Sequence, residues 1–134
     1  ERYGVSRRLG QLADKSVEPV ARIRAHFEYF RDEQLDAGIA TGCLLGNFGT
    51  EIVDHSETIR GGVRDGLAVW AEMLSAALAE GQGAGSIRKD LDADATARYL
   101  ISAWEGTLIQ ARTFKSAEVF DNFFDLTFNS LLKA

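Results

Sequence analysis

A chain of 134 residues with an apolar fraction of 46% and a charged fraction of 26% has the size and composition of one globular domain. The net charge of −5, with arginines scattered among acids, argues against direct nucleic-acid binding, because phosphates attract clustered Lys and Arg. No apolar run approaches the ~20 residues of a transmembrane helix, no signal peptide is visible, and a single cysteine excludes an internal disulfide, so we expect a cytoplasmic protein.

Apolar residues recur at helical spacing along the whole chain, and the alternating pattern of strands is absent. The sequence therefore predicts an all-α fold, a helical bundle of five to six helices. Ser16, Thr41, Ser56 and Ser116 are the predicted N-caps, and the glycine-rich residues 81–86 are predicted as a loop. The predicted helices cover residues 4–13, 17–36, 42–55, 57–80, 92 or 94 to 114, and 117–132.

Three of these helices have a clear core face. The predicted core residues are Val20, Ile23, Phe27, Phe30 and Gln34 in the second helix, Ile59, Val63, Leu67, Trp70, Leu74 and Ala77 in the fourth, and Ala97, Leu100, Ile101, Trp104, Leu108 and Ala111 in the fifth. The fifth helix also has a charged stripe that consists of Asp94, Arg98, Glu105 and Arg112.

The last two predicted helices are apolar on more than one side. In the last helix the apolar arc is about twice the ~100° of an ordinary surface helix, so burial of one side would leave Val119, Phe123 and Leu126 in water. We therefore expect the last two helices to form a four-helix dimer interface with a symmetry mate, unless the last helix is buried on both sides within the monomer. The predicted interface residues are Ala103, Gly106, Gln110, Val119, Phe123 and Leu126.

Cys43 is the only thiol and is predicted near the start of a helix capped by Thr41. The helix dipole and the unpaired N–H groups of such a position lower a thiol pKa, which favours a reactive cysteine. The alternative is that Cys43 is a small buried hydrophobic residue beside Leu44 and Leu45.

The two histidines, His26 and His55, allow a catalytic pair with Cys43, but no metal-ligating spacing such as CxxC or HExxH is present. The glycines of residues 81–86 lack the preceding strand and the following Lys of a phosphate loop. We therefore expect no catalytic residues, no metal and no cofactor.

Two tryptophans, Trp70 and Trp104, lie at the centres of the core faces of the two longest helices. They are either plain core or, with Phe27, Cys43 and Asn47, the lining of a small-molecule pocket, because such pockets combine aromatic walls with a few polar groups. These five residues are our candidate ligand-binding residues.

The order of several short motifs resembles the effector-binding region of TetR-family transcriptional regulators. The motifs are Gly42-Cys43-Leu44-Leu45-Gly46-Asn47, then Ser56-Glu57, Arg60 and Trp70, then Gly85-Ser86-Ile87-Arg88-Lys89-Asp90-Leu91-Asp92, and then Trp104-Glu105-Gly106 and Ala111. The resemblance covers essentially the whole chain. It implies an all-helical domain that binds a small effector, dimerises through its last two helices and follows a helix-turn-helix domain.

On this resemblance, residues 1–14 are the end of the helix that couples the two domains, and residues 15–134 are the effector-binding and dimerisation domain. Operator DNA would be bound only through the helix-turn-helix domain, which is missing before Glu1. Some relatives sense electrophiles or oxidants through the cysteine that Cys43 matches, although Arg112 replaces a Lys that they often carry. We therefore expect a non-enzymatic homodimer, a repressor released by a small molecule or by modification of Cys43. The alternatives are a small thiol-dependent enzyme and a helical interaction module without a pocket.

Overall fold

The computed structural model describes residues 5–38 and 57–134, and within them the chain is almost entirely helical. Only an isolated bridge between Ile87 and Lys133 adds β-type pairing in the described ranges. The predicted all-α fold is therefore confirmed, while the helix predicted over residues 42–55 lies outside the described residues. The helices are α1 (Val5–Ala13), α2 (Pro19–Asp36), α4 (Glu57–Ala84), α5 (Ala93–Phe114), α6 (Glu118–Leu126) and the π-helical η3 (Thr127–Leu131).

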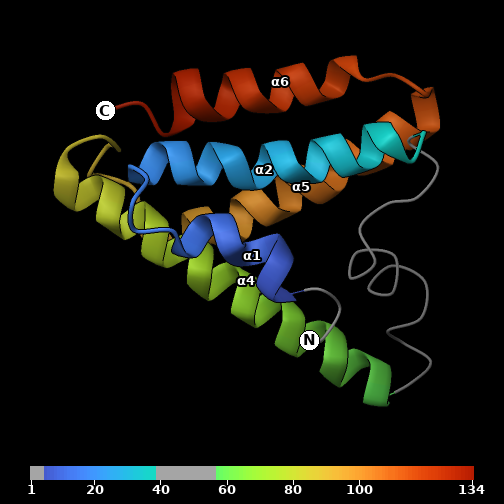
Figure 1. Cartoon of the computed structure of the whole chain (residues 1–134), viewed down its shortest axis with the longest axis horizontal. Helices are drawn as coiled ribbons and strands as arrows, with labels where there is room; N and C mark the ends of the chain where they lie inside the picture. Colours follow the sequence, from blue (N-terminus) through green and yellow to red (C-terminus); the bar gives the residue numbers. More distant parts are fainter. Residues whose placement is uncertain (1–4, 39–56) are drawn as a thin grey trace.

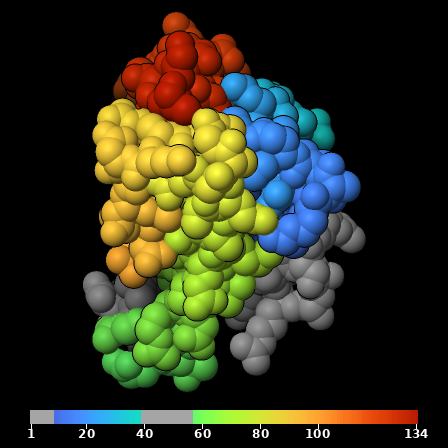
Figure 2. Space-filling view, turned by 90° about the vertical axis from the view of Figure 1, so that its left-hand side faces the viewer, coloured from blue at the N-terminus to red at the C-terminus, as the bar shows by residue number. Residues whose placement is uncertain are grey.

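The helices pack as a bundle in which α2 lies between α6 and the pair formed by α4 and α5 (Figure 1). The long helix α4 packs against α5, α2 and α1, and the short helix α1 also packs against α2. Figure 2 shows α6 (red) at one end of the molecule and the first turns of α4 (green) at the other. Of the helices that the structure describes, none combines the length and the apolar character needed to cross a membrane.

The core is centred on aromatic side chains of α2, α5 and α6. The Trp104 ring lies 5.4 Å from the ring of Phe27, 5.5 Å from that of Phe120 and 5.0 Å from that of Phe123, measured between centroids. All four side chains are buried. The predicted core face of α5 is confirmed in full, since every one of its six residues is buried.

Two predicted helix starts differ from the structure by one or two residues. Glu18, not Ser16, is the N-cap of α2, and its carboxylate accepts a hydrogen bond from the backbone N–H of Ala21. Ser16 instead donates its hydroxyl to the carboxylate of Asp14 in the preceding turn. Ala117 occupies the N-cap position of α6, although the Ser116 hydroxyl accepts from the backbone N–H of Glu118 at 3.2 Å.

The predicted loop over residues 81–86 is wrong for its first four residues, because α4 continues to Ala84. The reason is packing. Gly81 is buried against the side chain of Ile87, and a Cβ at residue 81 would lie 2.7 Å from Ile87 Cγ1. Gly85, at φ +80°, then ends the helix in the left-handed conformation that glycine adopts without strain.

Candidate functional site

The three predicted ligand-binding aromatics that the structure describes lie in the core. Phe27, Trp70 and Trp104 are each at most 3% exposed. The ring of Phe30 lies 5.5 Å from that of Trp70 and 6.4 Å from that of Trp104, so an aromatic side chain occupies the space between the two indoles. The other two candidates, Cys43 and Asn47, lie outside the described residues.

His26 is a buried polar group of this core that the sequence analysis did not place there. The Trp70 indole N–H donates a hydrogen bond of 2.7 Å to His26 Nε2, and the imidazole makes edge contacts with the rings of Phe27 and Phe30. Because Nε2 accepts this bond, it is unprotonated. His26 therefore joins α2 to α4. Its spacing from Ile23, Phe27 and Phe30 was the signal that could have found it.

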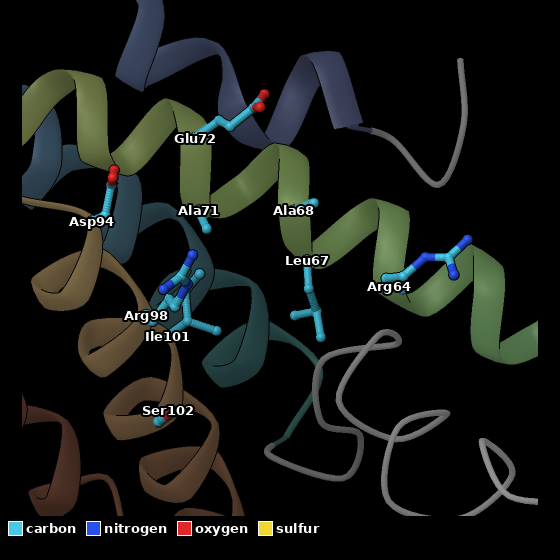
Figure 3. A pocket seen from close by; sticks show the side chains of 9 residues that line it. All are labelled: Arg64, Leu67, Ala68, Ala71, Glu72, Asp94, Arg98, Ile101 and Ser102. Carbon is cyan, nitrogen blue, oxygen red and sulfur yellow. The ribbon is translucent and has the colours of Figure 1, made fainter.

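An open hollow of about 680 Å³ lies between α4 and α5 (Figure 3). In this view Leu67 and Ala71 point from α4 toward α5, and Arg98 and Ile101 point from α5 toward α4. None of the described residues that line the hollow is Phe27, Trp70 or Trp104, and Cys43 and Asn47 of the predicted set lie outside the described residues. The residues that line it are Arg64, Leu67, Ala68, Ala71, Glu72, Asp94, Arg98, Ile101 and Ser102.

A groove of about 320 Å³ lies between α5 and α6. Five of the six residues predicted for the dimer interface line it, all except Gly106. The groove is lined by Tyr99, Ala103, Thr107, Gln110, Val119, Asn122, Phe123, Leu126, Thr127 and Leu131.

The exposure of the groove residues differs from the expectation at one position. Leu126 is 63% exposed and Val119 is half-buried, as expected for a monomer. Phe123, however, is only 6% exposed, because its ring also contacts Phe27 at 4.9 Å inside the same chain.

An ion-pair cluster ties the turn between α1 and α2 to the end of α4. The Glu80 carboxylate accepts hydrogen bonds from Lys15 Nζ at 2.7 Å and from the buried guanidinium of Arg22 at 2.6 Å. These two donors lower the pKa of Glu80 below its usual value. Arg22 also donates to the backbone carbonyl of Val17 at 2.8 Å. In the described ranges no group of three or more His, Cys, Asp or Glu side chains could hold a metal ion.

The described helices form an all-helical domain with an open hollow between α4 and α5 and a groove of mixed apolar and polar lining between α5 and α6. The model of the family described as "Tetracyclin repressor-like, C-terminal domain" matches residues 19–126. The chain belongs to this family. The family consists of transcriptional regulators, so the chain is not an enzyme, in agreement with our expectation.

Curated relatives agree with this assignment. The chain is 35% identical over 121 residues to the HTH-type transcriptional repressor DhaR of Mycobacterium sp. (strain GP1), covering 90% of this chain and 59% of that protein. It is 29% identical over 99 residues to the transcriptional regulator AcuR of Cereibacter sphaeroides, covering 74% of this chain and 45% of that protein. The chain thus spans about half the length of the curated relatives that it matches.

A solved structure shows the same fold. The regulatory protein TetR from Rhodobacter sphaeroides superimposes with a TM-score of 0.86 at 27% sequence identity. The match covers 95% of this chain and 67% of that one. The described helices therefore form the C-terminal domain of a TetR-like transcriptional regulator.

Proposed function

We propose that this chain is the ligand-sensing and dimerisation domain of a cytoplasmic TetR-like repressor. The observation that carries the proposal is the groove between α5 and α6, where Tyr99 is 61% exposed and Leu126 is 63% exposed. Large exposed aromatic and apolar side chains beside a groove of mixed apolar and polar lining are typical of a contact between protein chains.

The occupant that fits this groove is a second copy of the chain. Two copies related by a two-fold axis would place α5 and α6 against their counterparts as four helices. Ala103 and Gly106 are small and only half-buried, so they leave room for a helix of the partner to approach α5 closely. The exposed Leu126 of one copy would then be removed from water by the other.

The oligomeric state tests this part of the proposal. Sedimentation of the chain at micromolar concentration should give twice the monomer mass of 14.7 kDa. Leu126→Glu should give a monomer, because the substitution places a charge in the interface. Leu35→Glu is the matched control, since Leu35 is 41% exposed on α2 and does not line the groove, and it should remain dimeric. A wild-type monomer would contradict the proposal.

In the same proposal, residues 1–14 are the end of the helix that couples this domain to a helix-turn-helix domain, and residues 15–134 form the sensing domain. The helix α1 packs against α2 and α4, so a ligand that favours one packing of α4 would shift the position of α1. That shift would re-space the two DNA-reading heads of the dimer and release the operator. Full-length protein whose operator affinity ignored every candidate effector would contradict this mechanism.

A second route of release is modification of Cys43, which remains our candidate sensor of electrophiles or oxidants. The support is the resemblance of residues 42–47 to the cysteine-containing segment of sensing relatives and the predicted position of Cys43 near a helix start. A thiol reagent should release the full-length wild-type protein from its operator, and Cys43→Ser should abolish that release. An equal response of both proteins to the reagent would rule out the thiol.

A further inference from the structure

The hollow between α4 and α5 has the dimensions and the walls of a small-molecule site. Its volume of about 680 Å³ lies within the range of roughly 300–1,000 Å³ that is typical of ligand pockets. Three short side chains are among those that line it, Ala68 and Ala71 on α4 and Ser102 on α5. Leu67 and Ile101 supply apolar surface on the two opposing helices.

Of the two arginines among the described residues that line the hollow, one has no acidic partner. Arg98 points from α5 toward α4 beside Ile101, and its guanidinium makes no hydrogen bond or ion pair with the described part of the chain (Figure 3). The other guanidinium, that of Arg64, lies 3.3 Å from the carboxylate of its neighbour Asp65. Among the described residues that line the hollow, Arg98 is therefore the arginine whose guanidinium has no such partner.

The two acids that line the hollow in the described part of the chain, Glu72 and Asp94, form no ion pair with this guanidinium. The carboxylate of Asp94 accepts a hydrogen bond from the Ser75 hydroxyl. In Figure 3 the carboxylate of Glu72 extends to the other side of the α4 ribbon from Ala71 and Leu67. The planar fork of an arginine matches a carboxylate in two parallel hydrogen bonds, so an available arginine beside an apolar wall suits an organic acid.

We propose that the hollow between α4 and α5 binds a small carboxylate with an apolar body. Arg98 contacts the carboxylate, and Leu67, Ala71 and Ile101 contact the apolar body. This assignment rests on the proposed ligand-sensing function and specifies the chemistry of the effector. It also specifies that the ligand bridges α4 and α5, the two helices whose relative packing it would fix.

Titration calorimetry of the chain with hexanoate and with hexanamide tests the proposal, because the two probes share a six-carbon chain and differ in charge. Hexanoate should bind more tightly than hexanamide. Arg98→Gln should weaken hexanoate about 10-fold or more and leave hexanamide unchanged, since hydrogen bonds to a charged group are among the strong ones.

Two further variants separate the site from general effects of charge. Arg88→Gln is the matched control, because Arg88 is paired with Asp90 on the turn between α4 and α5, outside the hollow, and it should bind hexanoate as the wild type does. Ala68→Phe should weaken binding of both probes, because residue 68 lines the hollow and a phenyl group there takes up part of its space. Absence of hexanoate binding, or equal weakening by Arg98→Gln and Arg88→Gln, would overturn the proposal.

The same probes distinguish this proposal from the proposed function. If hexanoate binds through Arg98 but leaves the operator affinity of the full-length protein unchanged, the result supports the assigned site and contradicts ligand sensing through it. If another effector changes the operator affinity and Arg98→Gln binds hexanoate as tightly as the wild type, the result supports ligand sensing and contradicts the assigned site.

Discussion

The two halves of α4 are held in the bundle in different ways. Its C-terminal half contributes six buried residues, Trp70, Leu74, Ser75, Ala77, Leu78 and Gly81, whereas the first thirteen residues contribute only Val63. The C-terminal half is also tied to α2 by Trp70 and His26 and to the turn between α1 and α2 by Glu80. Of the α4 residues that line the hollow, Arg64, Leu67 and Ala68 precede these restraints, and Ala71 and Glu72 follow Trp70 directly.

This difference shows how one helix can serve both stability and response. Segments with few buried contacts open or shift at the lowest free-energy cost, and ligand-responsive elements come from them. A ligand in the hollow would contact Leu67 and Ala68 in the less restrained half of α4 and Ala71 at the start of the other half, and α4 also packs against α1. The helix itself would connect the two.

The sharpest test of the comparison is the same substitution in each half. Leu67 and Leu74 are seven residues apart and lie on one face of α4, but Leu74 is 0% exposed and Leu67 is half-buried at the hollow. Leu74→Ala should lower the free energy of unfolding by about 2–5 kcal/mol, and Leu67→Ala by less than about 2 kcal/mol. Urea denaturation measures both. Equal losses would remove the distinction between the halves.

The second prediction concerns the hydrogen bond at the boundary of the two halves. Trp70→Phe keeps an aromatic ring but removes the N–H that donates to His26 Nε2, so the free energy of unfolding should fall by about 1–3 kcal/mol. A double-mutant cycle with His26→Leu isolates the bond from the change in ring size. A coupling energy near zero would show that the bond contributes nothing to holding α2 against α4.

The buried faces of the helices could be predicted from the sequence, but the end of α4 and the hollow between α4 and α5 could not. Spacing alone placed Trp104, Leu74 and Phe27 in the core, because burial follows the helical period. The predicted end of α4 was wrong because the low helix propensity of glycine describes the residue by itself. In the fold, Gly81 stays in the helix and packs against Ile87. The hollow escaped prediction because it is lined by side chains of two helices that meet only in the fold.

The third prediction uses two glycines at the restrained end of α4. Gly81→Ala should destabilise the protein by about 1–3 kcal/mol, because the new Cβ would crowd the buried side chain of Ile87. Gly83→Ala is the matched control, since nothing lies within 4 Å of a Cβ there, and it should stabilise α4 by up to about 1 kcal/mol. Thermal unfolding of both variants measures these changes in stability. A neutral Gly81→Ala would mean that the contact with Ile87 relaxes freely.

The smallest expected effect is that of the ion-pair cluster, because the Glu80 side chain is 36% exposed and the interaction is screened by water. The pKa of the Glu80 carboxyl in the folded protein lies below the ordinary value of 4.5. The ion pairs of Glu80 therefore stabilise the fold above about pH 4.5, and this stabilisation is lost as the pH falls through the folded-state pKa. Glu80→Gln should therefore be less stable than the wild type near neutral pH and should approach it in acid.

Glu72→Gln on the same helix is the control for this last comparison, because Glu72 is exposed and forms no ion pair with the described residues. It should follow the wild-type dependence of unfolding on pH. If Glu80→Gln also follows the wild-type curve, the cluster does not restrain the turn between α1 and α2. The coupling of α4 to α1 would then depend on apolar packing alone, through the buried side chains of Leu9 and Leu12 on α1.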